Sequence, residues 1–164
     1  MKKVFLLIIW ASITATTCVP FHEPESTWAW SPVYISRESL ENSVKYTPQA
    51  RPMIQTGKIY YRAPYIYVNE RFKGVHVINN TNPAHPVVEG FILAPGCIDM
   101  AVKENILYLD NAVDLVSFDL DTKQVTKRIR NVFPEPLPPE DFRFYGSPNR
   151  PKGYVLVEWK KTTT

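Results

Sequence analysis

The sequence is poor in the residues that build short catalytic and metal-binding motifs. Its 164 residues include only two cysteines, three histidines and six glycines. None of the histidines, His22, His76 and His85, has a second ligand at the spacing of His-x-x-x-His or Cys-x-x-Cys. Gly-x-Ser-x-Gly, a phosphate-binding glycine loop and a dinucleotide-binding fingerprint are also missing, and Ser147 has no base nearby in the sequence. We therefore predict a protein that is not an enzyme, with no catalytic residues, no metal and no cofactor.

A strong charge of either sign is also lacking. The formal net charge is +3, and loss of Lys2 and Lys3 with a cleaved leader lowers it to about +1. Nucleic-acid-binding domains usually carry a strongly basic patch. We therefore predict that nucleic acid is not a partner.

The N-terminus has the pattern of an export signal. Lys2 and Lys3 precede an apolar run over residues 4–10, and small residues follow as far as Cys18. The run is shorter than the ~20 residues that span a bilayer, and the whole pattern is typical of a secretory signal peptide. We predict a signal peptide over residues 1–17; a buried N-terminal strand is the alternative.

Cys18 resembles the cysteine of the bacterial lipoprotein lipobox, whose thiol receives a diacylglycerol and becomes the new N-terminus. Lipoboxes usually have Leu where Ala15 stands and Gly, Ala or Ser where Thr17 stands, so cleavage without lipid is the alternative. The resemblance implies that Cys18 is the lipid attachment site. It also implies an exported protein, anchored to a membrane at the periplasm or outer membrane. Acyl chains contribute roughly 0.8 kcal/mol per buried CH₂, so two or three of them anchor durably.

Cys97 is then the remaining thiol. We expect it to be a small core residue and not a reactive one. If Cys18 is not acylated, a disulfide between the two cysteines is an alternative, which spacing alone does not establish.

Composition divides the rest of the chain. The leader, residues 18–56, is rich in proline and is predicted to be irregular apart from one short helix over 36–44. Ser36 would be the cap of this helix, Glu38 would lie at its positive end, and Leu40 and Val44 would lie on one side. Dense strand signals follow. Residues 134–152 form a Pro-rich loop, and residues 153–160 are predicted to form one more strand.

The middle of the chain repeats with a period of roughly 40 residues, which lies in the range of known repeat proteins. Ile59, Tyr61 and Tyr67 correspond to Met100, Val102 and Tyr108 in the next unit, and Asn79 corresponds to Asp119. The predicted strands are 57–62, 65–69, 74–79 and 87–93 in the first unit, and 97–103, 106–110, 114–119 and 124–130 in the second. Asn79 and Asp119 end their strands and can bond their own backbone there. Such a period with four short strands per unit is typical of a propeller blade, and two chance β-meanders are the alternative.

The residues of the third strands resemble a known repeat. Val-His-Val-Ile-Asn at 75–79 and Leu-Val-Ser-Phe-Asp at 115–119 resemble the motif of the LVIVD-repeat β-propeller family. Residues 36–41, 67–78 and 113–119 resemble lipoproteins of that family from Bacteroidota-like bacteria, and the likeness extends from about Pro32 to Trp159. It implies an all-β fold with two four-stranded antiparallel blades of a partial propeller, blade 1 over 57–96 and blade 2 over 97–133. It implies no catalytic residue.

Two blades do not close a propeller, which needs about four or more. Tyr60, Tyr61, Tyr65, Tyr67, Phe91 and Phe118 would then be left half covered. We therefore expect a truncated or fragmentary member of the family. The alternatives are self-association through the open blade faces, or terminal segments that fold over those faces, with Trp28 and Trp30 packed there.

The remaining chemistry is weak. Asp99, Asp110 and Glu70 lie at strand ends, but nothing in the sequence fixes two acids at a working distance, and we expect them to be solvent-exposed turn residues. The best-supported function is a non-catalytic, membrane-anchored propeller lipoprotein that presents an interaction surface to a protein or glycan. The alternatives are carbohydrate binding or processing at the envelope, and a non-functional fragment of a longer propeller.

Overall fold

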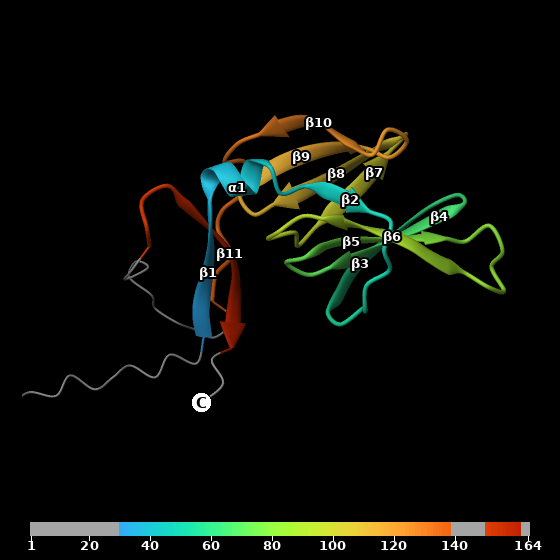
Figure 1. Cartoon of the computed structure of the whole chain (residues 1–164), viewed down its shortest axis with the longest axis horizontal. Coiled ribbons are helices and arrows are strands. Elements are labelled where there is room, and N and C mark those ends of the chain that lie inside the picture. The colour runs from blue at the N-terminus through green and yellow to red at the C-terminus, as the bar shows by residue number, and fades with distance from the viewer. Residues whose placement is uncertain (1–29, 139–149, 162–164) are drawn as a thin grey trace, which may run out of the picture.

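The computed structural model describes residues 30–138 and 150–161, and confirms an all-β fold with antiparallel sheets. One short helix accompanies eleven strands in the described residues. The predicted signal peptide over residues 1–17 and the residues Cys18, His22, Trp28 and Ser147 lie outside the described residues. The strands form a five-stranded sheet, a four-stranded sheet and a two-stranded ribbon, which are visible in Figure 1.

The first sheet contains the four predicted strands of the first repeat unit in chain order. They are β3 (Thr56–Arg62), β4 (Tyr65–Glu70), β5 (Gly74–Asn79) and β6 (Val87–Leu93). These bounds agree with the predicted strands to within one residue. A fifth strand, β2 (Lys45–Thr47), pairs with β6 at the outer edge and was not predicted.

The second sheet contains β7 (Met100–Lys103), β8 (Ile106–Asn111), β9 (Asp114–Asp119) and β10 (Gln124–Ile129), again in chain order. The predicted strand over 97–103 begins too early. Its correct start is Met100, because the backbone N–H groups of Ile98 and Asp99 bond the Asp110 carboxylate, at 2.8 and 2.9 Å, instead of a neighbouring strand.

The described part of the leader, residues 30–56, is not irregular, so this expectation was wrong there. It contains β1 (Trp30–Ser36), α1 (Arg37–Glu41) and β2. Ser36 is confirmed as the N-cap and accepts a hydrogen bond from the Ser39 N–H at 3.1 Å. The helix is shorter than the predicted 36–44, because Val44 packs from extended chain into the core between the sheets while Leu40 packs in a separate cluster.

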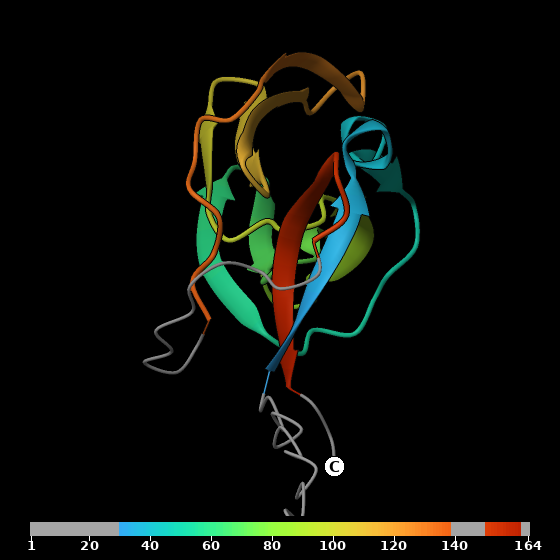
Figure 2. The same ribbon diagram turned by 90° about the vertical axis from the view of Figure 1, so that its left-hand side faces the viewer.

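The ribbon joins the two ends of the described chain. β1 pairs antiparallel with β11 (Tyr154–Lys161), a strand predicted over 153–160. Figure 2 shows the two strands side by side, with α1 at one end of β1. The ribbon packs on the β8–β9 turn through a small cluster composed of Leu40, Ala112, Val113, Val155, Val157, Val33 and Ile35. An isolated two-stranded ribbon is marginal in water, so this packing is what stabilises it.

Side chains alternate between the two sides of each sheet. We call the side of the first sheet that carries Tyr65 and Tyr67 its forward side, and the side that carries Ile59 and Tyr61 its rear side. In the second sheet, the repeat-equivalent residues place Tyr108 on the forward side, and Met100 and Val102 on the rear side.

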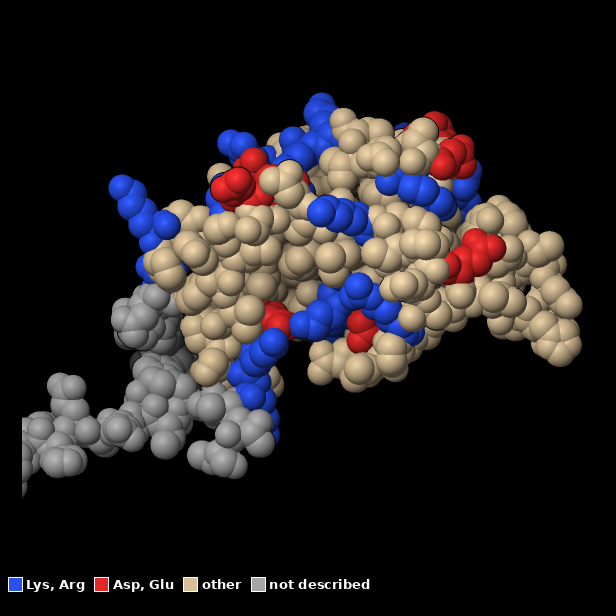
Figure 3. Space-filling view, in the orientation of Figure 1, with Lys and Arg blue, Asp and Glu red and all other residues tan. Residues whose placement is uncertain are grey.

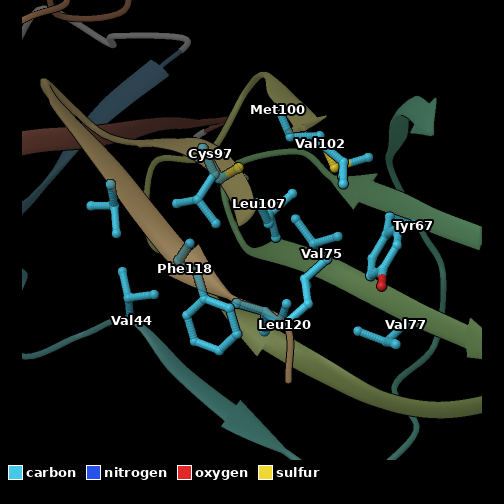
Figure 4. Packing of buried hydrophobic residues seen from close by; sticks show 14 residues of the cluster. Val44, Tyr67, Val75, Val77, Cys97, Met100, Val102, Leu107, Phe118 and Leu120 are labelled. Atoms are coloured by element: carbon cyan, nitrogen blue, oxygen red, sulfur yellow. The ribbon is translucent and has the colours of Figure 1, made fainter. Parts of the chain in front are cut away.

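The main core lies between the forward side of the first sheet and the rear side of the second. Figure 4 shows side chains from both sheets meeting there. The buried members are Val44, Tyr67, Val75, Val77, Ile92, Ala94, Cys97, Met100, Val102, Leu107, Leu109, Val116, Phe118 and Leu120. The inner strands β3 and β7 contact one another, and so do β2 and β10 at the outer edge. The two sheets therefore pack face to face in the same orientation.

Phe118 is the largest side chain that the second sheet buries in this core, with no exposed surface. We expect Phe118→Ala to lower the free energy of unfolding by about 3–5 kcal/mol, because it removes apolar area and leaves a cavity. Chemical denaturation of the purified protein measures this change. Lys127→Ala, an exposed substitution in β10, is the control and should stay within about 0.5 kcal/mol. A small effect of Phe118→Ala would contradict a single core shared by the two sheets.

Candidate functional site

The rear sides of the two sheets differ strongly in exposure. Ile59 and Tyr61 in β3 are 66% and 60% exposed, whereas the equivalent Met100 and Val102 in β7 are 4% and 6% exposed. The residue types are similar, so the cause is the environment. The first sheet covers Met100 and Val102, and no described residue covers Ile59 and Tyr61 to the same degree.

Part of this rear side is covered by the end of the leader. The Glu70 carboxylate accepts hydrogen bonds from the backbone N–H groups of Ile54, at 3.1 Å, and Gln55, at 2.5 Å. The guanidinium of Arg51 lies 4.7 Å from the centre of the Phe91 ring, and this ring packs edge-on to His76 at 4.8 Å. Phe91 and His76 are therefore buried although no sheet lies over them.

The covering segment itself adds apolar surface. Met53 is 41% and Ile54 80% exposed. We call Met53, Ile54, Ile59 and Tyr61 together the open surface. Ile54 is held through Glu70 to the same side of the sheet as Ile59 and Tyr61, and exposed apolar residues gathered on one side of a domain are typical of an interaction site. Figure 3 shows that the far right end of the molecule is mostly uncharged on the face in view, apart from one acidic patch, whereas Lys and Arg gather over the middle and left.

Glu70 is not the solvent-exposed turn residue that was expected, because its side chain is buried. His76 Nε2 lies 3.2 Å from its carboxylate. Burial raises the pKa of Glu70, but hydrogen bonds from the backbone of Gln55 and Ile54 and from His76 outweigh burial and hold the pKa below its usual value. Glu70 therefore fixes the leader to the rear side as an ionised group. His76 is a strand residue, as predicted, with Nδ1 unpaired.

The second buried carboxylate, Asp114, joins the leader to the second sheet. It has no exposed surface and pairs with Arg37 at 2.8 Å and Arg128 at 2.9 Å. Burial raises the pKa of Asp114, but hydrogen bonds from Arg37, the Asn131 N–H and Arg128 leave it below its usual value. Arg128 also donates to the Leu40 and Glu41 carbonyls at 3.3 Å, at the end of α1. This arrangement is structural, since every charge is paired.

The other acids also bind backbone or neighbouring side chains. Asp99 is exposed, as expected, and pairs with Lys58 at 2.6 Å. Asp110 was expected in solvent but is half-buried, and burial raises its pKa although it accepts two backbone N–H groups. Cys97 is confirmed as a buried core residue, and burial, followed by the nearby Asp110, raises the pKa of its thiol well above its usual value. The thiol is therefore unreactive.

The remaining predicted residues lie apart from one another. Asn79 and Asp119 bond the backbone N–H two residues on, each at 2.9 Å, which confirms their turn-forming role. His85 is exposed in a turn, and Trp30 is half-buried in β1. Within residues 30–138 and 150–161, His, Cys, Asp and Glu form no group of three that could hold a metal ion.

One hollow lies beside the ribbon. It has a volume of about 390 Å³ and is lined by Arg37, Lys152 and residues 150–155. Arg37 is already bonded to Asp114, and Arg150 is bonded to Glu135 at 2.7 Å. Both arginines of the hollow therefore serve the fold, and the open surface remains the better candidate site. No helix in the described part of the chain is long and apolar enough to cross a membrane.

Comparisons of the chain with protein-family models, with curated proteins and with solved structures found no match. The assignment of a function therefore depends on the residues and their geometry.

Asp114 provides the first test of these contacts. Asp114→Ala leaves two arginines without their carboxylate, and we expect a loss of about 3 kcal/mol or more in the free energy of unfolding. Asp99→Ala is the matched control, because its partner Lys58 is more than half exposed, and it should cost about 1 kcal/mol or less. Denaturant titration of both variants provides the comparison. Equal effects would contradict the role of Asp114 as the joint between α1 and the second sheet.

Glu70 provides a test by pH. Because its folded pKa lies below the unfolded value, its contribution to stability is complete above the unfolded pKa and is lost as pH falls through the folded pKa. We expect Glu70→Gln to be less stable than the unsubstituted protein at pH 6, and to lose less Tm between pH 6 and about pH 3. The exposed Glu104→Gln should leave the Tm curve unchanged in shape. Parallel curves for Glu70→Gln and the unsubstituted protein would count against this role.

Proposed function

We propose that this protein is a non-catalytic LVIVD-repeat lipoprotein of the cell envelope. It is a partial β-propeller that is held to a membrane through Cys18. The protein presents the open surface to a protein partner. The observation that carries the proposal is the contrast between equivalent positions. Ile59 and Tyr61 are open where Met100 and Val102 are buried. Repeat units of this kind bury their faces against neighbours, so an open face is a position for a binding partner.

The blade assignment is supported by the way the two sheets are related. Both contain four consecutive antiparallel strands, and inner strand β3 contacts inner strand β7 while outer strand β2 contacts outer strand β10. Radially packed four-stranded sheets with this neighbour relation are typical of propellers. The absence of catalysis is supported by the buried and half-buried carboxylates Glu70, Asp110 and Asp114, which accept hydrogen bonds from backbone N–H groups or from arginines that hold the fold together.

Carbohydrate binding is a weaker candidate. Tyr61 is exposed and offers a ring on which a sugar could stack. The acids that a carbohydrate-processing site requires are otherwise engaged, Asp99 with Lys58 and Asp110 with two backbone N–H groups. A protein partner fits the open surface better, because its exposed residues are mainly aliphatic.

The anchor is tested in a bacterial host that expresses the whole chain. We expect the protein to incorporate labelled palmitate and to sediment with membranes. Cys18→Ser should abolish the label and release the protein into the soluble fraction, because the acylated thiol is lost. Thr17→Ser, which brings the sequence closer to the lipobox pattern, is the control and should behave like the unsubstituted chain. Membrane attachment of Cys18→Ser would refute the lipid anchor.

A further inference from the structure

We propose that the partner of the open surface is a second copy of this chain, bound head to tail through the forward side of its second sheet. This inference rests on the proposed function and names the partner of the same surface. Inside each copy, a forward side packs against a rear side to form the core. The proposed contact would form the same kind of packing between two copies.

The forward side of the second sheet has the features that such a contact needs. Ala101 is exposed, Ile129 is 45% exposed, and Ile106, Tyr108 and Leu115 are half-buried. The equivalents of Tyr108 and Leu115 in the first sheet are Tyr67 and Val75, which are 2% and 0% exposed beneath the second sheet. The same positions are therefore buried wherever a next sheet is present.

The rear side of the first sheet also has exposed apolar residues that no sheet covers. Ile59 and Tyr61 are separated by a single residue and lie on one side of β3, as Met100 and Val102 do on β7. Inside the chain, Tyr60 packs against the cluster that contains Met100. Ala101 occupies the position of Tyr60, and Ile59 occupies the position of Met100. Ala101 of one copy would therefore meet Ile59 of the next.

This contact joins two different surfaces, so a pair of copies still has one free rear side and one free forward side. Such heterologous contacts form rings where the rotation closes, and chains of copies where it does not. A stable contact needs about 1,200 Å² or more of total buried surface, and the apolar parts of one side of each sheet, together with Met53 and Ile54, are the surface available for it. The internal core already pairs a forward side with a rear side, and the contact between copies would pair the same two kinds of side, which argues for a second copy over an unrelated protein.

Cysteine cross-linking tests the orientation. Ile59→Cys and Ala101→Cys are made separately in a Cys18→Ser chain, and Cys97 is buried and does not interfere. Under oxidation, or with a short bis-maleimide, we expect a mixture of the two variants to give a covalent dimer. Each variant alone should give no covalent dimer on a denaturing gel, and a chain with both cysteines should give a ladder. Dimers from either variant alone would overturn the head-to-tail arrangement, and no cross-link in the mixture would overturn the contact.

Light scattering with a concentration series tests the surface. We expect the Cys18→Ser chain to increase in mass with concentration, and Tyr61→Lys to stay monomeric with an unchanged Tm. Val87→Lys is the matched control: Val87 is 59% exposed, close to the 60% of Tyr61, but lies at the far end of β6 on the other side of the sheet. It should assemble like the unsubstituted chain. A folded monomer at all concentrations, or equal effects of both variants, would overturn the proposal.

The two levels of the proposal can fail separately. A cooperative melt at monomer mass, together with loss of the membrane label in Cys18→Ser, would overturn assembly and keep the anchored interaction protein. Head-to-tail cross-links in a chain that never takes a lipid would overturn the lipid anchor and keep the assembly of copies. Aggregates without a melting transition would overturn both, because the two sheets would then require further units to fold.

Discussion

The packing of the forward side of the first sheet on the rear side of the second is the contact on which the rest of the structure depends. Within each sheet, adjacent strands pair their backbone hydrogen bonds with one another, so the backbone alone does not require a second sheet over its face. The apolar sides do. Fourteen buried residues share this one core, and it includes residues from both repeat units and Val44 from the leader. The burial of apolar surface holds the sheets together, because each Å² removed from water contributes ~25 cal/mol to stability.

The leader connects the two sheets and the strand β11 to one another. Its strand β1 pairs with β11, and Arg37 and the end of α1 meet Asp114 and Arg128 of the second sheet. Strand β2 then extends the first sheet, and the segment that follows binds Glu70 on the rear side. The stretch from β1 to the start of β3 thus contacts both sheets and the ribbon. The leader therefore decides how much of the rear side stays open.

The sequence was informative wherever the signal was local or repeated. The period of the repeat located eight strands, and the side chains of Ser36, Asn79 and Asp119 bond the backbone as predicted. It was uninformative for contacts between distant residues. Nothing local marks Lys45–Thr47 as a partner of β6, or Asp114 as the partner of Arg37, which lies far from it in the chain. Glu70 looked like a turn residue because its partners come from a Pro-rich segment without a pattern of its own.

The repeat also bears on the strength of any contact between copies. The forward side of the second sheet has a smaller residue where Ala101 replaces Tyr60 and a more polar one where Ser117 replaces Val77. On the rear side, His76 replaces Val116 and is already covered together with Phe91. Both changes reduce the apolar area that a contact between copies can bury relative to the internal core. Association of copies should therefore be weaker than the internal packing and reversible. On a membrane it would be favoured, because anchored copies are held at a high local concentration.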